Sequence, residues 1–129
     1  MGNIKLPIEE FDFHVDRKDF SKKKVNENGY MCNKEYRGCL FLESYLHGTL
    51  YEGCTFLNCM FDRTCLNSVV FLNCRFVRCT MESARLKDVF FLTCDFAKGL
   101  VLDGSVMTNV VFKQGVLKGL SDKNVIVRK

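Results

Sequence analysis

A large apolar residue recurs at every fifth position through the middle of this chain of 129 residues. The column consists of Phe41, Leu46, Tyr51, Phe56, Phe61, Leu66, Phe71, Phe76, Met81, Leu86, Phe91 and Phe96. A smaller residue, often cysteine, stands two positions before each member. A repeat of five matches neither the helical period of about 3.6 nor the strand period of about 2. It predicts short strands that turn a square corner after each pentad, with the bulky and the small residue both facing inward.

The bulky residues also sort by type at a longer period of 20 positions. The sets are Phe41, Phe61 and Met81; Leu46, Leu66 and Leu86; Tyr51, Phe71 and Phe91; and Phe56, Phe76 and Phe96. Like residues stack on like residues when the coils of a repeat structure lie in register. The second period therefore predicts that four pentads complete one coil.

One small and one bulky inward residue per pentad is a pattern that resembles the pentapeptide-repeat family. The resemblance implies an all-β fold, a right-handed quadrilateral β-helix. The frame slips by one residue around Ala97–Val101, as a bulge at a corner would allow. It resumes with Leu102, Met107, Phe112 and Leu117, whose small partners are Leu100, Ser105, Val110 and Gly115. We therefore expect 16 pentads, or about four coils.

The segments on either side of the repeat are expected to cap it, because the ends of stacked repeats need caps. Residues 1–35 predict an N-terminal capping strand, in which Phe11, Phe13 and Val15 alternate with polar residues, followed by a polar loop. Ile8 and Phe20 would help this strand to close the first coil. Residues 36–117 make up the β-helix. Residues 118–129 form a C-terminal cap or tail, in which Val125–Val127 would lie across the last coil.

The eight cysteines are expected to serve mainly as core residues. Six of them occupy the small inward column, where a thiol acts as a compact hydrophobe: Cys39, Cys54, Cys59, Cys74, Cys79 and Cys94. Disulfides or a zinc site are alternatives, but the spacing follows the repeat and contains no CxxC pair. Cys32 and Cys65 fall outside the column and are the better candidates for reactive thiols. We expect no metal site, and unpaired cysteine favours a reducing compartment.

No catalytic constellation stands out, and we expect neither enzyme activity nor a cofactor. His14 and His47 both fall on polar, outward positions, and the chain has no glycine-rich phosphate loop. Asp62, Glu82 and Asp103 share one outward column. That column suggests either a cation site or dispersed surface acids.

The net charge of +4 is not arranged for nucleic-acid binding. Residues 36–117 carry eight basic and seven acidic residues, and the remaining excess of three lies in the flanks. Binding of nucleic acid calls for a basic stripe on one face, whereas Arg63, Arg75, Arg78, Arg85 and Lys87 are spread over three faces. No apolar run approaches the ~18 residues of a membrane span. We expect neither nucleic-acid binding nor direct membrane insertion.

An outward-facing apolar strip is the first candidate for a protein-binding surface. On the third face of the coil, Leu50, Val70, Phe90 and Val111 precede the bulky position, and Leu72 and Leu92 follow it. Leu57, Val77 and Ala97 would extend the strip onto the fourth face. Contiguous apolar surface on a soluble protein marks a contact site. A partner protein or a second copy would cover it, unless the strand around Phe13 or the tail at Val125–Val127 does so.

The second candidate is the edge of the last coil, at Val110, Val111, Phe112, Lys113 and Gln114. An open strand edge presents backbone groups that a strand from a partner can extend. The sequence therefore predicts two surfaces for protein partners, one made of side chains and one made of backbone.

A narrower resemblance concerns Asn33–Gly38, the bulky series through Phe56 and the preceding Phe11–Phe13 strand. These segments are similar to the luminal domain of the synaptic vesicle glycoprotein two family, which lies between transmembrane helices of a transporter-like protein. The resemblance implies a vesicle-lumen or extracellular location and a receptor for botulinum neurotoxin, bound partly through a backbone edge strand. The alternative is a free-standing cytoplasmic pentapeptide-repeat protein, either an effector or a DNA mimic that protects topoisomerases. The near-neutral repeat disfavours the mimic, because imitation of phosphates needs an acidic rod.

Overall fold

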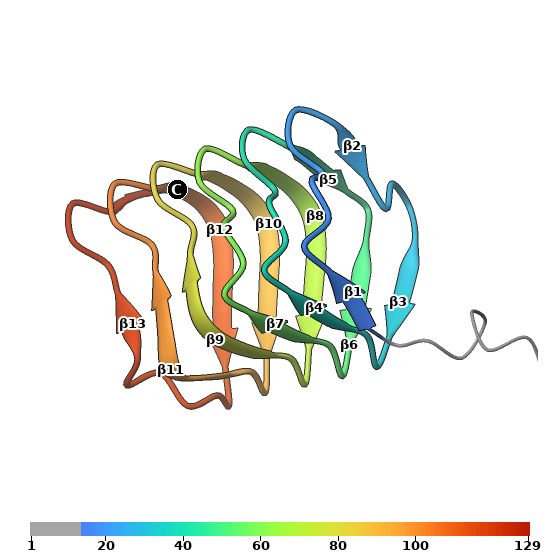
Figure 1. Cartoon of the computed structure of the whole chain (residues 1–129). Coiled ribbons are helices and arrows are strands. Elements are labelled where there is room, and N and C mark those ends of the chain that lie inside the picture. Colours follow the sequence, from blue (N-terminus) through green and yellow to red (C-terminus); the bar gives the residue numbers. More distant parts are fainter. Residues whose placement is uncertain (1–13) are drawn as a thin grey trace, which may run out of the picture.

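The computed structural model describes residues 14–129, and every regular element in that range is a β-strand (Figure 1). The strands are β1 (His14–Asp16), β2 (Lys24–Val25), β3 (Tyr30–Cys32), β4 (Glu35–Arg37), β5 (Tyr45–His47), β6 (Leu50–Glu52), β7 (Thr55–Leu57), β8 (Cys65–Leu72), β9 (Arg75–Thr80), β10 (Arg85–Leu92), β11 (Asp95–Val101), β12 (Val106–Lys113), β13 (Leu120–Ser121) and β14 (Ile126–Arg128). The strand pairs run parallel, and each strand lies beside its counterpart in the next coil. The predicted β-helix is therefore confirmed.

The solenoid has about six coils, so the expectation of about four was too low. One sheet runs in the order β1-β4-β7-β9-β11-β13, a ladder of six strands with one strand from each coil. The additional layers come from the flanks. β1 pairs with β4, β2 with β5 and β3 with β6, so residues 14–35 form a coil of the ladder. At the other end, β14 pairs with β12, and the tail continues the ladder instead of lying across it.

One extra residue conceals the first coil from a search for a period of five. Val15, Phe20 and Val25 keep the five-residue spacing and contact the core, but the next bulky residue is Met31, six positions on. Val15 pairs with Tyr36, at an offset of 21 residues, because the extra residue lies between them. The expected cap residues Ile8, Phe11 and Phe13 lie outside the described residues.

Asn26 closes the coil at this extra residue. Its backbone adopts a φ of 52°, and its carbonyl accepts hydrogen bonds from the Gly29 N–H at 2.9 Å and the Thr49 hydroxyl at 2.7 Å. Its side-chain amide donates to the hydroxyl of buried Tyr51 at 3.0 Å. A buried hydroxyl needs a polar partner, so the interruption also supplies a polar group that the core requires.

The slip expected around Ala97–Val101 is confirmed. The register of β11 against β9 shifts between Asp95 and Lys98. Before the slip, paired residues are 20 positions apart, as in Leu66 and Leu86, and after it they are 21 apart, as in Leu86 and Met107. The ladder thus absorbs one extra residue without losing its inward column.

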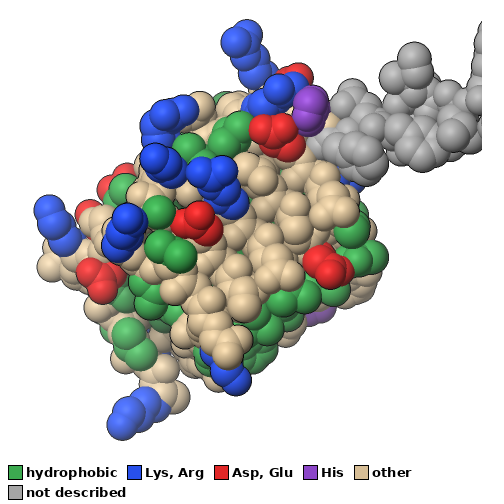
Figure 2. Space-filling view, turned by 90° about the horizontal axis from the view of Figure 1, so that it is seen from below, with side chains coloured by type: hydrophobic (Ala, Val, Ile, Leu, Met, Phe, Trp, Pro, Cys, Tyr) green, Lys and Arg blue, Asp and Glu red, His purple; other side chains and the backbone are tan. Residues whose placement is uncertain are grey.

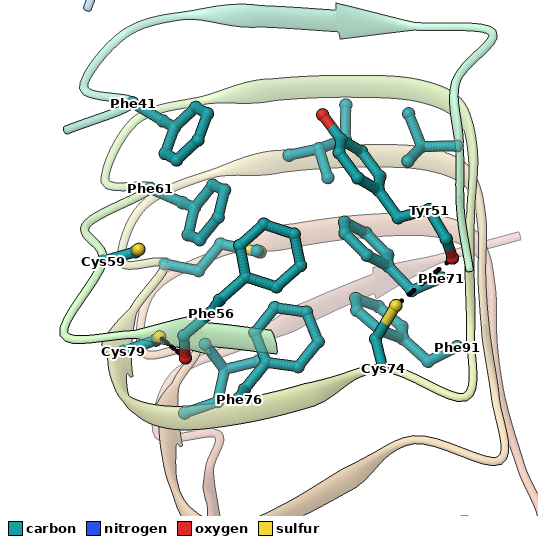
Figure 3. Packing of buried hydrophobic residues seen from close by; sticks show 14 of the residues in the cluster. Phe41, Tyr51, Phe56, Cys59, Phe61, Phe71, Cys74, Phe76, Cys79 and Phe91 are labelled. Carbon is teal, nitrogen blue, oxygen red and sulfur yellow. Dashed lines mark hydrogen bonds between the residues drawn. The ribbon is translucent and has the colours of Figure 1, made fainter. Parts of the chain in front are cut away.

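The bulky column forms stacks in the interior (Figure 3), and its members from Phe41 to Phe96 are at most 1% exposed. Rings one coil apart lie parallel: the centroids of Phe71 and Phe91 are 5.0 Å apart at 5°, and those of Phe56 and Phe76 are 5.0 Å apart at 14°. Rings from adjacent stacks meet edge to face, as Phe71 and Phe76 do at 5.4 Å and 69°. Both arrangements are favoured for aromatic pairs, so the predicted core is confirmed.

The corners turn through residues in the left-handed backbone region, two positions after the bulky residue. Asn58 and Asn73 have a φ of 53°, and Gly53 has a φ of 66°. Glycine and asparagine adopt this region more readily than other residues. Glycine and asparagine therefore recur at the corners of the coil. This recurrence is a second sign of the repeat in the sequence, in addition to the bulky and small inward residues.

Candidate protein-binding surfaces

The apolar strip on the third face is a continuous ladder across five coils. Its members pair in the order Tyr30, Leu50, Val70, Phe90 and Val111, and Leu72 pairs with Leu92 in the adjacent row. We call these seven residues the outer strip. Tyr30, which sequence reasoning missed, begins the ladder because it belongs to the concealed first coil. It is 55% exposed, and its hydroxyl donates to the Glu52 carboxylate at 2.5 Å, which raises the pKa of Tyr30.

The strip residues face outward because of the alternation along each strand. Tyr51, Phe71 and Phe91 lie buried in the interior, while their predecessors Leu50, Val70 and Phe90 are half-buried on the outside. The two ends of the row are more exposed, with Tyr30 at 55% and Val111 at 37%. Hydrophobic side chains form a band along the lower right edge of the face shown in Figure 2.

The tail does not cover the outer strip, so that part of the alternative explanation is wrong. β14 pairs with Val106–Thr108 of β12, which lies on the face next to the strip and not over it. The other proposed cover, the strand around Phe13, lies outside the described residues. Within residues 14–129 the outer strip faces solvent.

The expected extension onto the fourth face ends at the bulge. Leu57 pairs with Val77, but Val77 then pairs with Lys98, so Ala97 does not continue the row. Val77 itself is only 8% exposed. The extension is therefore wrong at Ala97, because the extra residue shifts the register there.

We call the last turn of the solenoid, residues 109–129, the last coil; it contains the edge expected at Val110–Gln114. β12 pairs with β10 along its length, but with β14 only over Val106–Thr108. Val110 and Phe112 point toward the core, where the Phe112 ring stacks on Phe91 at 4.7 Å, and Val111 and Lys113 alternate with them. Gln114 lies beyond the strand, at a corner with a φ of 56°. In the described chain, residues 110–113 pair on one side only.

The six cysteines of the inward column are buried, as predicted, and bond to the preceding coil. Their thiols donate to backbone carbonyls, for example Cys74 to Tyr51 at 3.2 Å and Cys79 to Phe56 at 3.1 Å (Figure 3). Thr64 repeats the pattern with a hydroxyl that donates to the Phe41 carbonyl at 2.8 Å. The small column therefore joins neighbouring coils by hydrogen bonds as well as filling space.

The environment of the core thiols disfavours reactivity. All six are at most 2% exposed, which keeps reagents away from them. The neighbouring sulfur of Cys79 and burial raise the pKa of Cys59, and the sulfurs of Cys54 and Cys94 and burial do the same for Cys74. Hydrogen bonds from the neighbouring sulfurs lower the pKa of Cys54, Cys79 and Cys94, so for these three thiols it is burial that disfavours reactivity. All eight cysteines lie within the described residues and none forms a disulfide there. Among residues 14–129, no group of three or more His, Cys, Asp or Glu side chains is placed to hold a metal ion.

The outward acids bond to the backbone of the next coil. Asp62 accepts the Glu82 N–H at 2.9 Å, and Asp103 accepts the Lys123 N–H at 3.0 Å and the Ser121 hydroxyl at 2.6 Å. The Ser121 bond lowers the pKa of Asp103. These contacts favour a structural role for the acidic column over a cation site.

The remaining polar residues singled out by the sequence lie on the surface. The His14 Nε2 lies 3.0 Å from a carboxylate oxygen of Glu35, and the His47 ring stacks on Tyr45 at 6.0 Å. Arg63 contacts Glu43 at 3.3 Å. No helix capable of spanning a membrane occurs in the described part of the chain.

One solved structure carries a comparison of this geometry with that of a known protein. No family model and no curated protein matches the sequence. A pentapeptide-repeat protein from the cyanobacterium Cyanothece 51142 matches the structure with a TM-score of 0.51 and 13% identity, covering 92% of this chain and 94% of the other. QnrB1, a plasmid-mediated fluoroquinolone resistance protein, matches with a TM-score of 0.44 and 13% identity over 90% of each chain. A pentapeptide-repeat protein of the Arabidopsis thaliana thylakoid lumen matches with a TM-score of 0.28 and 15% identity, over 88% of this chain and 68% of the other.

The fold is thus that of the pentapeptide-repeat proteins. The cyanobacterial structure carries this conclusion, because its likeness spans nearly the whole of both chains. At 13% identity it extends to the fold alone.

Proposed function

We propose that the protein is a non-enzymatic protein–protein interaction module whose outer strip contacts a protein partner or a second copy of the chain. The observation that carries the proposal is the uninterrupted ladder Tyr30–Leu50–Val70–Phe90–Val111, which faces solvent in the described structure. Apolar ladders of this length are stabilised when a partner removes them from water, at ~25 cal/mol per Å² of apolar area. Parallel backbone pairing on both sides of the inner strands makes the face rigid, which lowers the entropic cost of binding.

The open edge of β12 supports a second mode of protein binding. A partner strand added at Val110–Lys113 would extend the ladder that β10 and β12 already form. Strand addition is also the mode implied by the resemblance to the synaptic vesicle glycoprotein two luminal domain. Toxin recognition through that edge, and a luminal location, remain hypotheses that rest on the resemblance.

A topoisomerase-protecting DNA mimic fits the charge less well. The chain carries +4 overall. An acidic rod would be attracted to a basic DNA-binding groove, whereas a basic one is repelled. A free-standing effector remains compatible with either protein-binding surface.

The substitution Leu92→Lys tests the proposal, with Leu42→Lys as its matched control. Both leucines are half-buried and directly follow a buried phenylalanine, but Leu42 lies outside the outer strip. We expect both variants to fold, and only Leu92→Lys to abolish self-association in sedimentation experiments or partner capture in pull-downs. Pull-downs from cytosolic and vesicle-lumen fractions would separate the two cellular settings.

Two outcomes would contradict the proposal. If Leu92→Lys lowers the free energy of unfolding of the monomer by over ~1 kcal/mol more than Leu42→Lys does, another part of the chain covers the strip. If both variants associate as the wild type does, the strip is not a contact surface.

A further inference from the structure

The whole net charge of the protein lies in its last coil. Residues 1–112 contain 14 basic and 14 acidic residues, whereas residues 113–129 contain five basic residues and one acidic residue, Asp122. The difference of four equals the net charge of the chain, +4. The basic residues are Lys113, Lys118, Lys123, Arg128 and Lys129, and all five are exposed. Figure 2 shows Lys and Arg side chains projecting from the end of the rod opposite the grey trace.

The same coil encloses an apolar cavity at the open end of the core. Its volume is about 310 Å³, and its lining includes the apolar residues Met107, Val110, Phe112, Leu117 and Val127 and one acidic residue, Asp122, so the apolar and not the acidic side chains of a ligand would enter it. Leu117 and Val127 are 46% and 74% exposed. The coils before it close such a space by placing the next layer of bulky residues over it. The cavity is large enough for one or two apolar side chains of a ligand.

The open strand edge borders this cavity. Val110 and Phe112 belong both to its lining and to the part of β12 that pairs on one side only. Within the ladder, corner residues bond to the following coil: the Asn73 N–H donates to the Leu92 carbonyl at 2.9 Å, and the Thr93 N–H to the Lys113 carbonyl at 2.8 Å. Gln114 holds the same corner position in the last layer, where the described chain places no further coil. A strand paired there would direct alternate side chains into the cavity.

We propose that the C-terminal end of the rod binds an extended segment of a partner protein in which acidic and apolar residues alternate. The segment pairs with Val110–Lys113, its apolar side chains enter the cavity, and its acidic side chains face Lys113 and the other cations of the last coil. The proposal rests on the proposed function in treating the protein as an interaction module, but its surface is separate from the centre of the outer strip.

Charge complementarity selects this occupant over two others. A second copy docked end to end would bring two coils of the same positive charge together, which like-charge repulsion opposes. A nucleic acid would match the positive charge. Its phosphates, however, would neither fill an apolar cavity nor pair with an open strand edge. An acidic and apolar strand satisfies all three features at once.

The test uses the full chain and a fluorescein-labelled peptide of alternating valine and glutamate, ten residues long. Fluorescence anisotropy would compare it with a peptide in which lysine replaces glutamate, and with one whose alternate backbone nitrogens are methylated. We expect the glutamate peptide to bind at least about tenfold more tightly than the lysine peptide, and the methylated peptide not to bind.

Protein variants locate the binding. Leu117→Asp places a charge in the cavity at an exposed position, and Lys118→Glu with Lys123→Glu reverses charge beside it. Both should weaken peptide binding by about tenfold or more. The matched control is Lys23→Glu with Lys24→Glu, an equal reversal at exposed positions of the first coil, which should leave affinity unchanged.

Three outcomes would overturn the proposal. These are equal binding of the glutamate and lysine peptides, tighter binding of a 20-base-pair DNA duplex than of the glutamate peptide, and dimerisation that Leu117→Asp abolishes. The Leu92→Lys variant should bind the peptide as the wild type does. Peptide binding without strip-dependent association would mean that the proposed function fails while this proposal stands, and strip-dependent association without peptide binding would mean the reverse.

Discussion

The middle coils and the last coil follow the same sequence pattern but differ in how deeply their bulky residues are buried. Phe71 lies between Tyr51 and Phe91, with ring centroids 5.2 and 5.0 Å away, and is 0% exposed. Phe112 stacks on Phe91 at 4.7 Å and has no further ring beyond it among the described residues. Leu117, in the same column, is 46% exposed. At the C-terminal end of the rod, a bulky residue is therefore fully buried only where a further layer lies over it.

The comparison also separates stability from binding. The apolar residues of the middle coils contact one another and stabilise the rod through neighbouring coils. Those of the last coil retain apolar surface in contact with solvent, next to basic side chains and an open edge. The same five-residue repeat therefore builds a scaffold in one region and a candidate ligand site in another.

The largest expected effect comes from Phe71→Ala or Phe76→Ala. Each should lower the free energy of unfolding by ~3–5 kcal/mol, because the substitution leaves a cavity between two layers. The matched change Phe112→Ala should cost about 1–2 kcal/mol, since this ring is packed on one side. Chemical denaturation followed by circular dichroism measures both. Equal losses would show that the last coil is as well packed as the middle.

Thiol reactivity should also report on the packing of the middle coils, where the six core cysteines lie. Ellman's reagent should react rapidly with Cys32 and Cys65 in the folded protein, and slowly with the six core cysteines, which titrate only after unfolding. The reactive form is the thiolate, and the raised pKa of Cys59 and Cys74 keeps both protonated at a pH of about 8.5, where an ordinary thiol is half ionised. Burial alone protects Cys54, Cys79 and Cys94, whose pKa values the neighbouring sulfurs lower.

A substitution in the middle coils should weaken the protection of the core thiols, whereas one in the last coil should not. Phe71→Ala should speed the reaction of the core thiols by roughly a hundredfold to a few thousandfold, because a loss of ~3–5 kcal/mol favours global opening. Leu117→Ala in the last coil should leave their rate unchanged. Rapid reaction of all eight thiols in the wild type, or eight oxidised cysteines in the denatured, unreduced chain, would contradict the packing described for the middle coils.

The smallest expected effect concerns the corners. Thr93 has a φ of 53°, a region that a β-branched residue adopts at a cost and that asparagine adopts readily. Thr93→Asn should therefore stabilise the protein by about 0.5–1 kcal/mol. The reverse change Asn124→Thr, at a φ of 57° in the last coil, should destabilise it by less than that. A loss of stability in Thr93→Asn would mean that the bonds of the Thr93 hydroxyl, to Asn73 and to the Leu92 carbonyl, outweigh the strain.

Much of the scaffold could be predicted because its causes are local. The spacing of Phe41 to Phe96 reports which side chains face inward, and the same spacing places six cysteines in the core. The outward strip follows from the same alternation. These inferences need no knowledge of which coil lies beside which, since every coil repeats the same short unit.

The sequence-based predictions of the first coil and of the row through Ala97 were wrong, because in each place a single extra residue changes the register. The extra residue at Asn26 concealed the first coil and with it Tyr30, the first member of the outer strip. The bulge after Asp95 removed Ala97 from the predicted row, because Lys98 takes its place beside Val77. A one-residue change is a small signal in a sequence, but it moves every later contact with the neighbouring coil.

By itself, the sequence determined the repeat, its inward columns, the buried cysteines and the outward apolar face, because each depends on the five-residue alternation within a strand and its corner. Only the tertiary structure decided the number of coils, the place of the tail beside β12 and the cavity bordered by Phe112 and Leu117. These features depend on whether another layer lies against a given strand. Contact between layers joins residues about 20 positions apart, and the burial it produces is absent from any single pentad.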